Sequence, residues 1–108
     1  MQSGGLALFA IVLPVMRFEF SGVVFEWRGP APFYFVATPE EVAREIEGVK
    51  RELSYGWGVV PVTVTLGSIS AKTSLIPQNG GFLVPLKDAL RKPNSVNAGD
   101  QVTLSLEI

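Results

Sequence analysis

The sequence predicts a mainly β fold: a small closed or double-split β-barrel of about six strands with one amphipathic helix and one short helix. Three observations lead to this fold class: short runs of alternating apolar and polar residues, turn residues between them, and a single segment with helical periodicity. Alternation at every second residue is typical of a strand with one buried face. The 108 residues are enough for one domain.

The first sixteen residues, MQSGGLALFAIVLPVM, differ from the rest of the chain. Their apolar run is shorter than the roughly 20 residues that cross a bilayer. It also lacks the preceding positive charge and the cleavage site of a secretory signal. We interpret residues 1–15 as an extension outside the domain, upstream or from a misassigned start, and residues 16–108 as a single domain. A degenerate signal or anchor and an extra strand are the alternatives. A cytoplasmic protein without a membrane partner is expected.

The run RFEFSGVVFEW predicts the first strand, with Phe18, Phe20 and Val24 on one face. The alternation then slips by one residue, so that Phe25 and Trp27 take the apolar positions. A slip beside a glycine predicts a β-bulge at Gly22. The aromatic and β-branched run FYFVAT predicts the next strand.

The segment from Thr38 to Leu53 predicts the amphipathic helix. Thr38 is expected at the N-cap, with Pro39 at the first helical position and Glu41 completing a capping box. Apolar residues then recur at spacings of four, three and four, which places one apolar stripe along the helix. That stripe consists of Val42, Ile46, Val49 and Leu53.

The remaining strands are predicted in VVPVTVTL, ISAKTSL, GFLVP and QVTLSLEI, with a helical turn or two in LKDALRK. Asn79 and Gly80 lie between two extended runs, and Asn-Gly is the strongest short-range signal for a type I′ hairpin. A phosphate-binding loop would lead from glycines into a helix, whereas FLVPL is extended. Asp100 is expected to stabilise the turn before the last strand. The predicted inward-facing residues are Val60, Val62, Val64, Leu66, Ile69, Ala71, Thr73, Leu75, Val102, Leu104, Leu106 and Ile108.

The composition excludes several chemistries. The chain has no cysteine and no histidine, which removes thiolate nucleophiles, disulfides and most transition-metal sites and catalytic triads. We therefore expect no metal, no cofactor and no enzymatic activity. Nine basic against ten acidic residues give a net charge of −1, so nucleic acid is not expected as a partner.

The segment from Lys72 to Lys92 carries the candidate site, because it holds four basic residues and one acid. We predict a ligand-binding rim formed by Lys72, Ser74, Lys87 and Arg91, which would hold a small anionic ligand or a protein partner. Lys72 and Ser74 project from one face of a strand, about 6 to 7 Å apart, which is too far for direct proton transfer. The alternative is a scattered surface excess of charge. Four aromatic residues could line a pocket or belong to the core, namely Trp27, Tyr34, Tyr55 and Trp57.

The blocks FEFSGVVFEW, YGWGVVPVTVTLGS, KTSLIPQNGGFLVPLKDALRK and AGDQVTLSLEI resemble the bacterial family catalogued as domain of unknown function nineteen-oh-five, over residues 16–108. The resemblance implies a double-split β-barrel related in fold to dimeric, DNA-binding AbrB/MazE-type domains. It transfers no functional residue. The chain departs from the family in KPNSVNAGD, where Pro93 should end the small helix early.

These observations favour a non-catalytic binding or interaction module, acting as a monomer or weak homo-oligomer. A DNA-binding regulator is the first alternative, on fold analogy alone. An enzyme that uses lysine or carboxylates is the second.

Overall fold

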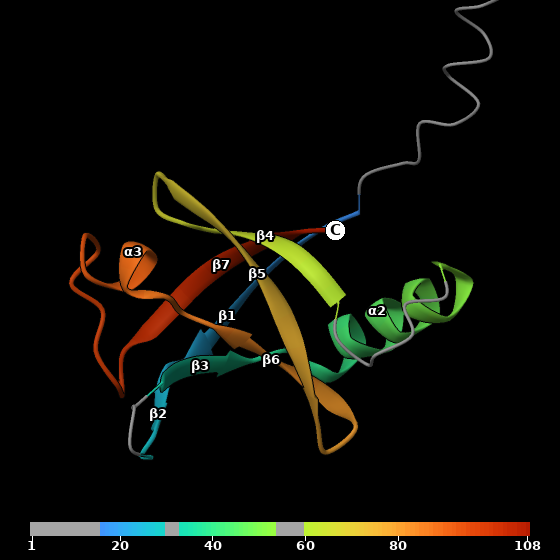
Figure 1. Ribbon diagram of the computed structural model, residues 1–108, viewed down its shortest axis with the longest axis horizontal. Coiled ribbons are helices and arrows are strands. Elements are labelled where there is room, and N and C mark those ends of the chain that lie inside the picture. Colours follow the sequence, from blue (N-terminus) through green and yellow to red (C-terminus); the bar gives the residue numbers. More distant parts are fainter. Residues whose placement is uncertain (1–15, 30–32, 54–59) are drawn as a thin grey trace, which may run out of the picture.

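The computed structural model describes residues 16–29, 33–53 and 60–108. They form one curled, half-barrel sheet of seven antiparallel strands and two helices, which lie at opposite sides of the sheet (Figure 1). The predicted fold class is confirmed. In chain order the elements are β1 (Arg17–Val23), β2 (Phe25–Trp27), β3 (Phe33–Ala37), α2 (Glu40–Leu53), β4 (Val60–Leu66), β5 (Ile69–Gln78), β6 (Gly81–Pro85), α3 (Asp88–Arg91) and β7 (Gln101–Glu107).

The count of seven strands arises because the first predicted strand divides at Val24. β1 pairs with β7 in one unbroken register, so the bulge predicted beside Gly22 is wrong. Val24 extends this ladder, since its N–H donates to the Asp100 carbonyl at 2.8 Å and its carbonyl accepts the Gly99 N–H at 2.7 Å. The alternation continues without a slip, which leaves Phe25 and Trp27 on the outer face of the sheet, 39% and 53% exposed.

Two long segments change partners along their length. The strand order is β1-β7-β4-β5-β6-β3-β2, so the two end strands are consecutive in the chain. The segment β1–β2 pairs first with β7 and then with β3. In the same way, β5 pairs with β4 up to Leu75 and with β6 from Ile76 onward. Both segments therefore belong to both halves of the curled sheet, which is the double-split arrangement.

The turn that joins β5 to β6 has the predicted conformation. Asn79 and Gly80 both have positive φ, 52° and 80°, as a two-residue type I′ turn requires. The predicted turn role of Asp100 is also confirmed, since its Oδ2 accepts the Asn97 N–H at 2.8 Å.

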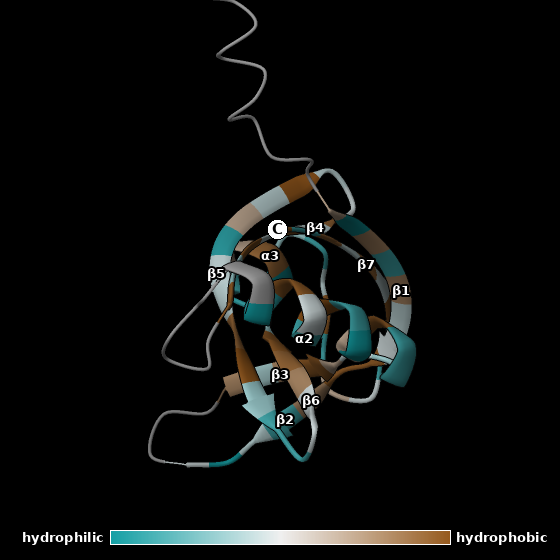
Figure 2. Cartoon of the chain, turned by 90° about the vertical axis from the view of Figure 1, so that its right-hand side faces the viewer, coloured by the Kyte–Doolittle hydropathy of each residue, from teal (hydrophilic) through white to brown (hydrophobic). Residues whose placement is uncertain are grey.

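The core lies inside the curled sheet, where the hydrophobic residues of the strands gather (Figure 2). No polar or charged side chain is buried in the described ranges. The alternation read from the sequence is confirmed for the β4 and β7 runs. In β5 it is interrupted at Thr73, which was predicted to face inward but is only half-buried, like Ser74 beside it. The predicted residues that are buried are Val60, Val62, Val64, Leu66, Leu75, Val102, Leu104 and Leu106, with Ile69, Ala71 and Ile108 packed against them.

The helix α2 is amphipathic as predicted, with Val42 and Ile46 buried against the sheet. Its start differs from the expected capping box. The Thr38 hydroxyl lies 3.3 Å from both the N–H and the carbonyl of Phe82, and so ties the start of the helix to β6. The short α3 is held by the buried Leu90. Neither helix in the described ranges is long and apolar enough to cross a membrane.

Candidate functional site

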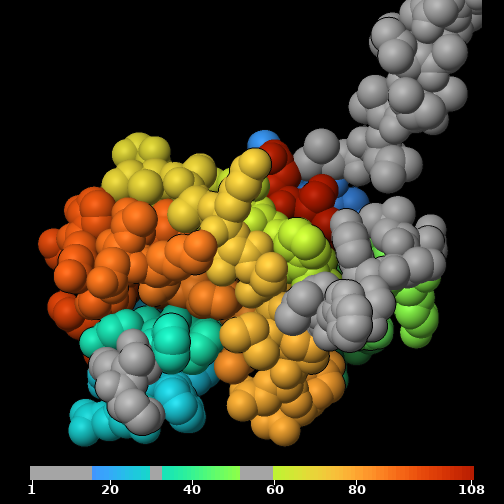
Figure 3. Space-filling model, in the orientation of Figure 1, coloured from blue at the N-terminus to red at the C-terminus, as the bar shows by residue number. Residues whose placement is uncertain are grey.

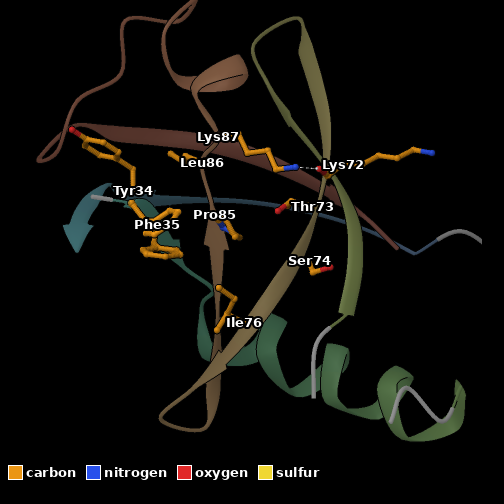
Figure 4. A pocket seen from close by; sticks show the side chains of 10 residues that line it. Tyr34, Phe35, Lys72, Thr73, Ser74, Ile76, Pro85, Leu86 and Lys87 are labelled. Carbon is orange, nitrogen blue, oxygen red and sulfur yellow. Dashed lines mark hydrogen bonds between the residues drawn. The ribbon is translucent and has the colours of Figure 1, made fainter. Parts of the chain in front are cut away.

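A groove of about 650 Å³ lies where β5 and β6 separate (Figure 4). This volume falls within the roughly 300–1,000 Å³ of typical small-molecule sites. On the face shown in Figure 3, β5 runs diagonally across the molecule and meets β3 and the segment before α3. The lining residues are Phe33, Tyr34, Phe35, Lys72, Thr73, Ser74, Ile76, Pro85, Leu86 and Lys87.

The separation of the two strands has a cause in the sequence. Leu83 is the last residue of β6 that pairs with β5, opposite Ile76. If the same register continued, Pro85 would face Ser74. Proline has no N–H to donate, so the ladder cannot continue there. β6 remains paired with β3 on its other edge, and the gap that opens toward β5 is the groove.

The floor and the rim of the groove are mainly apolar. Leu86 and Phe35 are buried and form its base, while Phe33 and Ile76 stand at its rim, 52% and 40% exposed. Apolar side chains that remain open to solvent at a concave surface are stabilised when a ligand covers them. The groove therefore offers apolar contact area to a bound molecule.

Lys87 brings a positive charge to this apolar groove. Its Nζ donates to the Lys72 carbonyl at 2.8 Å, across the gap between the two strands. Backbone groups of alternate residues in an antiparallel strand point to opposite edges. Since the Lys72 carbonyl points into the gap, the backbone groups of Ser74 point the same way. The groove thus combines one ammonium group with an unpaired strand edge.

The structure brings three of the four predicted site residues together. Lys72, Ser74 and Lys87 line the groove, although the side chain of Lys72 extends away from Lys87, so the two ammonium groups do not converge (Figure 4). Arg91 lies outside the lining. Its guanidinium covers the ring of Tyr34, with Cζ 3.9 Å from the ring centroid, and donates to the Val96 carbonyl at 3.2 Å. Arg91 positions Tyr34 rather than reaching the groove.

The polar side chains that line the groove are those of lysine, serine, threonine and tyrosine. In the described ranges, no hydrogen bond joins the Ser74 hydroxyl to a lysine. Likewise, no group of three or more acidic residues gathers in the described part of the chain to hold a metal ion. The groove instead presents apolar surface, hydroxyl groups and one nearby ammonium.

Sequence reasoning missed the apolar lining of the groove. Phe33 and Phe35 read as ordinary strand residues, whereas Ile76 follows the predicted strand ISAKTSL and Leu86 begins the predicted helical turn. Only Pro85 carries a signal, because a proline at the end of a strand marks where pairing stops. Of the predicted aromatic candidates, Tyr34 lines the groove and Trp27 lies outside it. Tyr55 and Trp57 lie outside the described residues.

A second depression of about 300 Å³ lies on the outer face of β1, β4, β5 and β7. Its charges neutralise each other, since Arg17 Nη2 lies 2.6 Å from Glu107 Oε2. Thr65 and Ser70 also share a hydrogen bond of 2.7 Å across it. These polar side chains are already paired across the strands, and we assign no ligand to this depression.

Residues 20–106 match the family described as Domain of unknown function (DUF1905). No curated protein matches the chain. The matched range includes every residue that lines the groove, whereas residues 1–15, interpreted as an extension, lie outside both the match and the described residues.

Proposed function

Because the chain belongs to the family described as Domain of unknown function (DUF1905), we propose its function from the groove: a non-catalytic binding module for a small molecule with an apolar, preferably aromatic body and one anionic group. The observation that carries this proposal is the position of Lys87 beside an apolar groove at the β5–β6 separation.

The apolar body of the ligand would lie against Phe33, Phe35, Ile76 and Pro85. Aromatic side chains favour flat ligands, because offset or edge-on ring contacts add to the stabilisation from buried area. The rings of Phe33 and Phe35 lie 6.3 Å apart at an angle of 40°, and Phe33 is 52% exposed, so its ring is the one that a flat ligand can cover.

The anionic group would lie at Lys87. No carboxylate lines the groove, so an anion there meets no acidic side chain among the lining residues. Lys87 now donates to a neutral carbonyl. A carboxylate or phosphate is a stronger acceptor for an ammonium than a neutral carbonyl, because opposite charges add a direct attraction to the hydrogen bond. Anion binding therefore gives the ammonium a better partner.

The geometry supports a small ligand over nucleic acid. Recognition of DNA needs a row of cations aimed at phosphates. Here α3 spans only Asp88–Arg91, and the guanidinium of Arg91 is engaged with Tyr34, Asp88 and Val96. The enzyme alternative would require a general base beside Ser74. In the described ranges neither lysine of the groove is hydrogen-bonded to Ser74: Lys87 binds the Lys72 carbonyl, and the Lys72 side chain extends away from Lys87 (Figure 4).

The test is a titration of the full chain with naphthoate and its neutral analogue naphthamide, followed by amide chemical shifts. We expect naphthoate to shift the amides of the groove strands and to bind more tightly than naphthamide. Lys87→Met keeps most of the aliphatic stem and removes the charge, so it should weaken naphthoate binding about tenfold, or about 1.4 kcal/mol, and leave naphthamide unchanged.

Lys92→Met is the matched control, because Lys92 is exposed, pairs with Asp88 at 3.5 Å and does not line the groove. It should leave both affinities unchanged. Shifts confined to other surfaces, or equal losses in the Lys87 and Lys92 variants, would refute the proposed site.

A further inference from the structure

β2 lies at one end of the strand order, and its outer edge pairs with no strand in the described part of the chain. Three large aromatic side chains stand out on the same sheet face around this edge: Phe25, Trp27 and Phe33, 39%, 53% and 52% exposed. Their rings form a contiguous cluster with Phe35, with centroids 5.8 to 6.3 Å apart. Contiguous exposed aromatic surface of this kind marks an interaction site.

The hydrogen bonds of the neighbouring strands show which backbone groups of this edge are free to bind. The Tyr34 carbonyl accepts the Leu86 N–H at 2.8 Å, so Tyr34 directs its backbone groups toward β6. Glu26 pairs with Tyr34 and therefore directs its own groups away from β3, to the outer edge. The backbone groups of Val24 point the same way, but they are already hydrogen-bonded to Gly99 and Asp100. In β2 the outward groups that follow Val24 are those of Glu26. If the extended backbone continues one residue beyond β2, those of Arg28 have the same direction.

We propose that a second copy of this chain pairs with β2 in an antiparallel, two-fold arrangement centred on Trp27. In this register Glu26 of each copy lies opposite Arg28 of the other. Because these are the residues with outward backbone groups, each pair can exchange two backbone hydrogen bonds. A two-fold axis repeats the pair, and the same edge serves both copies.

The charges of the edge select this register. Glu26 and Arg28 lie two residues apart on one face of the segment, and their side chains already approach each other, with Arg28 Nε 3.5 Å from Glu26 Oε1. Centring on Trp27 places opposite charges across from each other twice, which stabilises a strand pair. Centring on Glu26 would instead oppose two glutamates and would place Arg28 against Val24, whose backbone is already occupied.

Trp27 lies at the centre of the proposed interface. A central pair that shares no backbone hydrogen bonds brings the two side chains closest, with Cα atoms about 4.5 Å apart. The indole of Trp27 packs against Gly29, where an added Cβ would lie 2.1 Å from the ring. The ring is thereby held on the outer face, where it can meet Trp27 of the second copy and extend the aromatic cluster across the axis.

The test uses charge reversal and sedimentation equilibrium of the full chain. Wild type is expected to show a monomer–dimer equilibrium. Glu26→Arg and Arg28→Glu each place like charges opposite each other across the interface. Each should therefore raise the dissociation constant of the dimer about tenfold or more. The double variant restores opposite charges and should associate like wild type. An equimolar mixture of the two single variants should also associate, since every cross-strand pair between them is then attractive.

The matched control is the exchange Glu40→Arg with Arg44→Glu on α2, whose side chains pair at 3.5 Å away from β2. These single and double changes should leave association unchanged. Three results would each overturn the proposal: a monomeric wild type at the highest soluble concentration, single variants at β2 that associate like wild type, or a mixture that stays monomeric. Rescue in the double variant and in the mixture shows that a loss in the single variants is not a folding defect.

Discussion

Two segments change pairing partners along their length, β5 and β1–β2, and they differ in where the unpaired edge faces. Each changes partner at a buried apolar residue, Leu75 in β5 and Val24 between β1 and β2, exposed 0% and 1%. Each change leaves part of a strand edge unpaired. In β5 the free edge faces the end of β6, and the Lys87 ammonium reaches across to it. In β2 the free edge faces outward, beyond the Gly99–Asp100 turn.

The two partner changes leave unpaired strand edges of different shape, and we propose a different kind of ligand for each. An edge that faces another strand across a gap forms a concave groove, which suits a small molecule. An edge that faces solvent is flat and suits another strand, and proteins otherwise protect such edges with charges. The charges beside β2 are of opposite sign and two residues apart, so they do not prevent a two-fold pair.

Truncating the two residues at which the partners change should have the largest effect. Leu75→Ala is expected to cost about 3 kcal/mol of unfolding free energy, and Val24→Ala about 2 kcal/mol, because each leaves a cavity in the shared core. Urea denaturation measures both. Val23→Ala is the matched control: Val23 is 57% exposed and should cost no more than about 0.5 kcal/mol. Equal losses at Val23 and Val24 would contradict the assigned faces.

An effect no larger than that of Val24→Ala is expected where β1 crosses β3. A Cβ added at Gly22 would lie 2.6 Å from Val36 Cγ1. Gly22→Ala should therefore destabilise the protein by about 2 kcal/mol, because the packed core cannot accept the extra group. Val36→Ala removes the obstructing methyl, so the double variant should be more stable than the sum of the single losses by about 1 kcal/mol. Additive losses would contradict the close crossing.

The alternation of apolar residues was enough to predict the strands of the core. In β4 and β7 every second residue is buried, and the pattern cannot shift by one residue without exposing the whole set. The Asn79–Gly80 turn was predictable for a local reason, because few residues tolerate positive φ. These features depend on neighbours in the sequence.

The partner changes could not be predicted in the same way. Phe25 and Trp27 were predicted to face the core, because the sequence does not show which side chains of a strand face inward after the strand changes partner. Their exposure follows from the regular register of β1 with β7. Only part of the predicted cluster of basic residues comes together: Lys87 binds the backbone carbonyl of Lys72, whereas the guanidinium of Arg91 packs on the ring of Tyr34. Contacts between distant residues decide both outcomes.

Native-state hydrogen exchange of the β5 amides tests the partner change most directly. If β5 pairs with β6 only from Ile76 onward, the Ser74 N–H points into the groove, whereas those of Thr73 and Leu75 point toward β4. Ser74 should then exchange far faster than both neighbours. Protection of Ser74 equal to that of Thr73 and Leu75 would mean that β5 and β6 stay paired and that the groove does not exist.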